Sequence, residues 1–114
     1  SYNFSPLTAF SEDDPKAARE ILQTFSQETR KNLKKIQDAM QMEDMESLCA
    51  VAHKMLPTFI MIEARKAIPS LQWLEQQRGN HNYCQEATRA ASIIVEETKN
   101  ILGSKILKDT ERIS

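Results

Sequence analysis

Two histidines and two cysteines are the side chains of this chain best suited to nucleophilic or metal chemistry. His53 follows Ala52 within a run of helix-forming residues, whereas His81 lies among asparagines in a segment typical of a turn. An unperturbed imidazole titrates near pH ~6.5, so much of it is an unprotonated nucleophile at neutral pH. We therefore consider His53 first, as a nucleophile presented by a helix.

A metal site is the second chemical possibility. Cys49 and His53 are four positions apart, which places them on one face of a helix, and His81 with Cys84 would complete four ligands. The closely paired cysteines typical of a structural zinc site are absent from the sequence. We therefore expect no metal and no cofactor.

The elements that position these residues are predicted to be helices. Among 114 residues there are two glycines and four prolines, and Ala, Leu, Glu, Lys and Gln are abundant. Apolar residues recur every three or four positions in four stretches. The predicted helices run from Pro15 to Met40 with Asp14 as cap, from about Asp44 to Ile62, from Ile68 to a glycine cap at Gly79, and from a capping box at Asn82 and Gln85 to Ile101.

Short connections between these helices favour antiparallel neighbours. We expect an all-α fold, an up-and-down antiparallel four-helix bundle over residues 14–102. Residues 1–13 are expected to form a short helical lid built on Phe4, Leu7 and Phe10. Residues 103–114 are expected to be a polar tail, either frayed or packed as an extra helix.

A helical wheel separates His53 from the core-facing side of the second helix. The apolar stripe of that helix contains Leu48, Ala52, Met55, Phe59 and Ile62. His53 lies outside the stripe, so its imidazole is expected to face solvent. The residues expected beside it, as contacts for a docking partner, are Cys49, Pro57, Ile60 and Met61. Pro57 also removes the backbone donor that would bond the His53 carbonyl.

Ala52-His53-Lys54-Met55-Leu56-Pro57, in the middle of a helix, resembles the signature of histidine phosphotransfer domains, in which an alanine and a histidine precede a lysine. The segments Leu7 to Phe10, Phe25 to Thr29 and Leu74-Glu75 are similar to the versions fused to hybrid sensor kinases of Bacteroides-type bacteria. The resemblance spans most of the chain. It departs from the pattern at Leu56, where a lysine is common, and at Pro57, where a glycine is common.

The resemblance implies that residues 1–114 are one histidine phosphotransfer domain of a larger cytoplasmic or membrane-anchored sensor kinase. His53 would accept a phosphoryl group from an aspartate of one response-regulator receiver domain and pass it to another, and the receiver would bring Mg²⁺. Lys54 would steady the phosphoryl oxygens. Glu75, with Gln72 and Gln76 as substitutes, would hold the second ring nitrogen.

Charge and patterning argue against several other classes. Fifteen Lys and Arg against sixteen Asp and Glu leave no basic block for nucleic acid, and the apolar runs are too short for a membrane span. No glycine-rich phosphate loop is present, so we expect neither ATP binding nor enzymatic activity of its own. Two cysteines do not form a disulfide framework, which favours the cytoplasm.

An alternative function remains open at the level of sequence. A helical adaptor or dimerisation module that is never phosphorylated would use the same exposed apolar face. A lone exposed histidine on a helix is also commonly a plain surface residue. We expect the chain to be a monomer in isolation. Phosphorylation of His53 would distinguish a phosphotransfer domain from an adaptor.

Overall fold

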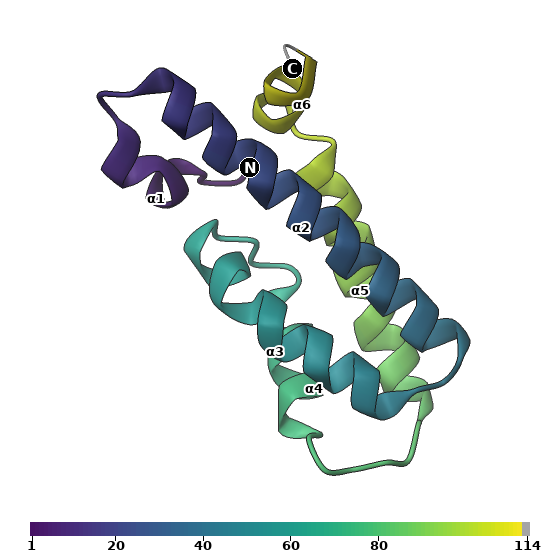
Figure 1. Ribbon diagram of the computed structural model, residues 1–114. Coiled ribbons are helices and arrows are strands. Elements are labelled where there is room, and N and C mark those ends of the chain that lie inside the picture. The colour runs from purple at the N-terminus through teal and green to yellow at the C-terminus, as the bar shows by residue number, and fades with distance from the viewer. Residues whose placement is uncertain (113–114) are drawn as a thin grey trace.

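The computed structural model describes residues 1–112, which form helices joined by short turns and contain no strand. The elements are α1 (Ser5–Thr8), η1 (Ala9–Ser11, a 3-10 turn), α2 (Pro15–Gln41), α3 (Met45–Met61), α4 (Ile68–Gln76), α5 (Gln85–Leu102) and α6 (Lys105–Arg112) (Figure 1). The all-α prediction is therefore confirmed for this part of the chain. α2 alone spans about 40 Å, and the molecule measures 48 × 22 × 20 Å.

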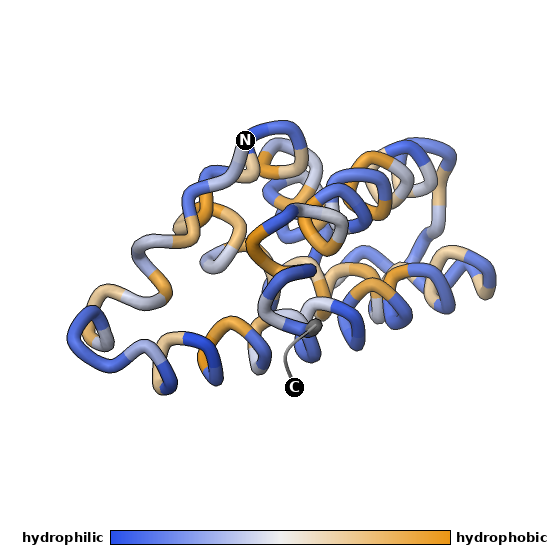
Figure 2. The backbone as a smooth tube through the Cα atoms, turned by 90° about the horizontal axis from the view of Figure 1, so that it is seen from above, coloured by the Kyte–Doolittle hydropathy of each residue, from blue (hydrophilic) through white to orange (hydrophobic). Residues whose placement is uncertain are grey.

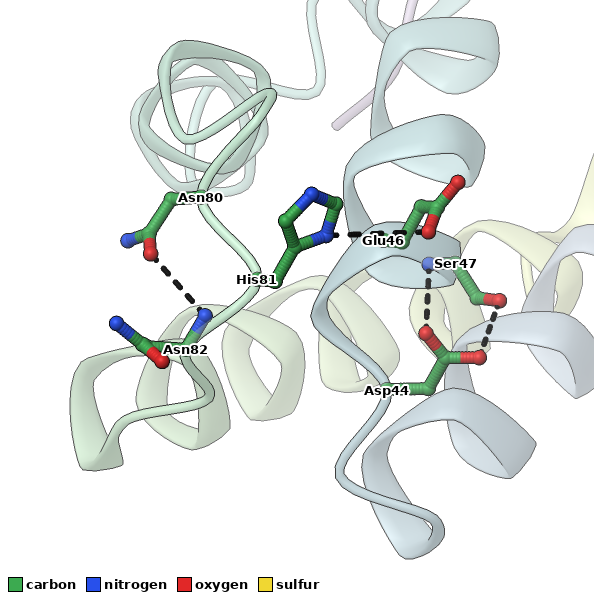
Figure 3. Close-up of polar contacts among 6 residues, drawn as sticks. All are labelled: Asp44, Glu46, Ser47, Asn80, His81 and Asn82. Carbon is green, nitrogen blue, oxygen red and sulfur yellow. Dashed lines mark hydrogen bonds and ion pairs between the residues drawn. The ribbon is translucent and has the colours of Figure 1, made fainter.

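Aspartate side chains cap α2 and α3, as the sequence predicts. The Ala17 N–H donates to Asp14 Oδ1 and the Ser47 N–H donates to Asp44 Oδ1, each at 3.1 Å (the second in Figure 3). The Ser47 hydroxyl also donates to Asp44 Oδ2 at 2.6 Å. These hydrogen bonds from Ser47 lower the pKa of Asp44. They fix where α3, the helix that carries His53, begins.

Both α2 and α3 end in a left-handed residue that turns the chain back. Glu43 has φ 52° and Glu63 has φ 60°. After α2, the Asp44 N–H donates to the Ala39 C=O at 2.9 Å, and the equivalent bond follows α3. This is the Schellman arrangement, which satisfies the last carbonyls of each helix. A glutamate occupies the position in both cases, where glycine would be less strained.

Packing places α2 against α3, α5 and α6, and α4 against α3 and α5. Hydrophilic and hydrophobic stretches alternate along the helices (Figure 2), and the hydrophobic ones supply one core. The predicted stripe of α3 is buried, as are the predicted inner positions of α5: Ala87, Ala91, Ile94, Thr98 and Ile101. None of the helices formed by residues 1–112 combines the length and apolar character that a membrane crossing requires.

The N-terminal segment is attached to the end of α3 and to α5. The Asn3 N–H donates to the Ile62 C=O at 2.9 Å, and the Asn3 side-chain amide donates to Glu63 at 3.1 Å. Burial and a hydrogen bond with Glu97 raise the pKa of Tyr2 to about 12. The segment therefore supports the C-terminal end of α3.

The lid differs from the prediction in detail, whereas the tail takes the packed form, one of the two that were expected. Phe4 is buried and Leu7 packs against the core, but Phe10 is fully exposed, so the lid is built on the first two alone. The tail is packed over residues 105–112, because the buried Leu107 anchors α6 and the Gln23 side chain donates to the Thr110 carbonyl at 3.3 Å. Residues 113–114 of the predicted tail lie outside the described residues.

The predicted capping box before α5 is wrong. Cys84, not Asn82, is the N-cap of α5, and no side chain caps the helix there. The Asn82 N–H instead donates to the Asn80 side chain at 3.1 Å, within a segment that has no regular secondary structure (Figure 3). Gly79, expected to cap α4, lies three residues after its end with φ 89° and turns the chain into this segment.

Candidate functional site

His53 lies in the middle of α3 with its side chain 54% exposed, as the helical wheel predicts. α3 is positioned by the buried side chains of Leu48, Met55 and Phe59 on its opposite side. The helix continues through Pro57, which has no N–H to offer the His53 carbonyl. The imidazole is therefore held on a rigid element and is open to a partner.

Glu75 of α4 is the side chain that meets His53. Its Oε2 lies 3.4 Å from His53 Nδ1, and the buried Leu71 and Leu74 hold α4 against the core at this level. The separation is longer than that of a strong hydrogen bond, which is about 2.9 Å. A carboxylate beside Nδ1 favours the tautomer that carries its proton there, which leaves Nε2 as the nucleophilic nitrogen.

A second contact between a histidine and a carboxylate, His81 with Glu46, connects α3 with the segment that follows α4. His81 Nδ1 lies 3.9 Å from Glu46 Oε2, between the segment after α4 and the first turn of α3 (Figure 3). Both side chains are largely exposed, at 75% and 82%. His81 is presented by a segment without regular secondary structure and not by a helix, so it lacks the rigid support of His53.

Cys49 does not belong to the exposed face on which it was expected. Its exposed fraction is 3%, and α4 is the helix that packs most closely on α3. Burial raises the pKa of the Cys49 thiol, and the positive charge of Arg78 partly opposes this. A docking partner cannot contact a side chain this deeply covered, so Cys49 is removed from the expected docking surface.

The other three residues expected on that face are exposed. Ile60 is 50% and Met61 is 44% exposed, and Pro57 is exposed as well. Ile60 and Met61 are unusual in their exposure, since the other large apolar side chains of α3 are buried or, for Leu56, partly buried. Together with His53 they form what we call the histidine face: His53, Pro57, Ile60 and Met61.

Lys54 lies on the flank of α3 that faces α2. It lines a groove of ≈ 400 Å³ with Lys35 and Asp38, and a smaller hollow of ≈ 50 Å³ with Glu28 and Asn32. His53 lines neither. The structure thus does not bring Lys54 together with the histidine and Glu75.

Within residues 1–112, no group of three or more His, Cys, Asp or Glu side chains is arranged to hold a metal ion. Cys49 and Cys84, two members of the alternative zinc set, are both free cysteines. One is buried in α3 and the other is the N-cap residue of α5. The structure therefore adds nothing to the zinc interpretation.

Arg78 is the residue near this site that the sequence reasoning did not single out. It is exposed, it follows Glu75 by three positions, and its charge acts on Cys49, one turn before His53. The three-residue spacing from Glu75 could have indicated Arg78, because residues three positions apart lie on one flank of a helical turn.

Comparison of the chain with protein family models, with curated proteins and with solved structures gave no match.

Proposed function

We propose that this chain is a histidine phosphotransfer domain, which accepts a phosphoryl group on His53 from a receiver aspartate and passes it to a second receiver. One observation carries the proposal: an exposed histidine at the middle of a helix, with a carboxylate 3.4 Å from its Nδ1. The neighbouring exposed Ile60 and Met61 support docking of another protein directly over the imidazole.

The proposed chemistry is an in-line phosphoryl transfer. The Nε2 lone pair of His53 attacks the phosphorus of an aspartyl phosphate, the P–O bond to the aspartate breaks, and the carboxylate leaves with the electron pair. The imidazole gains positive charge as the N–P bond forms. Glu75, beside Nδ1, stabilises that charge and can accept the Nδ1 proton. The reverse sequence returns the phosphoryl group to another aspartate.

The receiver domain would supply the remaining parts of the site. Mg²⁺ and the groups that stabilise the transferring phosphoryl oxygens belong to the receiver in this proposal, so this chain has no cofactor and takes no phosphate from ATP. Lys54 would contribute to the phosphoryl contact only by turning from its place beside α2. The relay is proposed to operate in the cytoplasm, as part of a larger sensor kinase.

The helix arrangement is compatible with this role. We propose that α2, α3, α4 and α5 correspond to an up-and-down antiparallel four-helix bundle, in which α3 presents the histidine. The contacts of α2 with α3 and α5, and of α4 with α3 and α5, support that assignment. α1 and α6 would be additions at one end, since both pack on α2.

A helical adaptor or dimerisation module is the second candidate function. The exposed Ile60 and Met61 favour it as much as they favour receiver docking. It gives no role to the contact between His53 and Glu75, which is why we prefer phosphotransfer.

Incubation with labelled ATP distinguishes the two candidates. The chain alone is expected to remain unlabelled, and addition of a histidine kinase with its receiver domain is expected to transfer label onto it while the receiver loses label. Receivers encoded in the same genome supply the panel to be tested. Stable receiver binding without transfer, across that panel, would favour the adaptor.

A further inference from the structure

Phosphorylation of His53 would bring two anions together at the face between α3 and α4. A phosphoryl group carries about −1.5 to −2 charges at pH 7. The Glu75 carboxylate already lies 3.4 Å from the same imidazole. The phosphoryl group on Nε2 and the carboxylate at Nδ1 would lie on either side of one imidazole ring, and like charges this close disfavour each other unless a cation lies near both. The face therefore needs a positive charge that reaches the phosphoryl oxygens.

Few basic side chains of this region have a suitable position. Lys54 lies on the flank of α3 that faces α2. Arg65 and Lys66 line a hollow around the N-terminus, at the other end of α4. Arg78 lies two residues after the end of α4, three positions beyond Glu75. It is the basic residue closest in the chain to the carboxylate that meets His53.

The backbone turn after α4 determines the flank on which the Arg78 side chain lies. The N–H groups of Gln77 and Arg78 donate to the carbonyls of Leu74 and Glu75, at 3.0 and 3.3 Å. The backbone therefore continues as a tighter helical turn, in which side chains three positions apart eclipse one another. Arg78 thus follows Glu75 on the same flank, about 6 Å further along.

Two contacts with α3 fix the level of Arg78 relative to the histidine: Glu75 with His53 before it, and His81 with Glu46 after it. Arg78 therefore lies near the level of Cys49, one helical turn from His53. Its charge acts on the Cys49 thiol, where it opposes the rise in pKa that burial causes. Within residues 1–112, the Arg78 guanidinium forms no ion pair of its own with a carboxylate.

We infer that Arg78 binds the phosphoryl oxygens on phosphorylated His53, as the cation that offsets the charge of Glu75. The inference rests on the proposed phosphotransfer function and deepens it. A guanidinium suits the role because its planar set of donors matches two phosphoryl oxygens at once. A cation at this position disfavours protonation of the phosphohistidine, so loss of the cation should let the phosphohistidine take up a proton at a higher pH.

The test phosphorylates the whole chain with phosphoramidate, a small donor that needs no protein partner. His53 Nε2 attacks the phosphorus, the P–N bond of the donor breaks, and ammonia leaves. The phosphohistidine signal is then followed by ³¹P NMR as the pH is lowered from alkaline values. The proteins compared are the parent, Arg78→Gln, Arg78→Lys and Lys105→Gln. Lys105 is the matched control, since it is exposed on α6, which packs on α2 and α5.

Arg78→Gln is expected to raise the titration midpoint of the phosphohistidine, observed through its ³¹P chemical shift, by roughly half a pH unit. Arg78→Lys should restore most of the parental midpoint, and Lys105→Gln should not change it. Circular dichroism should be the same for all four proteins, because both altered side chains are exposed.

Equal midpoints in Arg78→Gln and the parent would overturn the inference and leave phosphotransfer standing, because the phosphohistidine has still formed. Absence of phosphohistidine from the parent, with phosphoramidate and with phosphorylated receivers alike, would overturn the proposed function and the inference together.

Discussion

The Nδ1 atom of His53 and the Oε2 atom of Glu75 lie 3.4 Å apart on two different helices. α3 presents the histidine and α4 brings the carboxylate, so their meeting depends on the packing of these helices and on the turn between them. A carboxylate at Nδ1 orients the ring and leaves Nε2 for a substrate. The proposed function depends on this pair.

Glu75→Gln should slow phosphoryl transfer onto His53 by roughly tenfold, because an amide keeps the shape but loses the charge that stabilises the imidazolium. Rapid-quench transfer from a phosphorylated receiver measures the rate. Glu46→Gln is the matched control, since it removes the carboxylate beside the other histidine, at 3.9 Å. A parental rate in Glu75→Gln would make Glu75 a surface residue with no part in transfer.

Ile60→Glu should weaken receiver binding by roughly tenfold or more, because an apolar side chain near the centre of an interface carries much of the binding energy. Isothermal titration calorimetry with a receiver that transfers phosphate provides the affinity. Ile93→Glu, on α5, introduces the same charge at a side chain that is 44% exposed. If both variants bind as the parent does, the histidine face is not the docking surface.

Phe59→Ala should lower the free energy of unfolding by about 3 to 5 kcal/mol, because it leaves a cavity under α3. Phe59 is 2% exposed, whereas its neighbour Ile60 is 50% exposed. Ile60→Ala is therefore the control, with an expected change within about 0.5 kcal/mol. Urea unfolding measures both, and equal losses of stability would show that α3 is rotated relative to this description.

Local sequence signals predicted the helices and the outward direction of His53 well. Asp14 and Asp44 cap α2 and α3 as expected, because a capping interaction depends only on residues within one turn. The apolar stripe of α3 is buried because its period of three to four residues matches the helix.

The predictions for Cys49 and Lys54 failed because they depend on packing between helices, which no local sequence pattern contains. A helical wheel places Cys49 near His53 in angle, but α4 covers one turn and leaves the next exposed, so Cys49 is 3% exposed and His53 is open. Lys54 follows His53 directly, but the side chains of neighbouring helix residues point about 100° apart. Lys54 therefore lies against α2 and not beside His53. Asn82 is a local failure of a different kind: α5 begins only at Gln85, so the N-cap position falls on Cys84 and not on Asn82.

Site-specific labelling of His53 tests the central claim most directly. The parent, His53→Gln and His81→Gln are incubated with kinase, receiver and labelled ATP, and the label on each is measured after treatment with acid or base. The account predicts an acid-labile, base-stable label, as a phosphoramidate gives, on the parent and on His81→Gln. It predicts no label on His53→Gln, with helical content unchanged because the side chain is 54% exposed. A label on His53→Gln as strong as on the parent would contradict phosphotransfer through His53 and favour the adaptor.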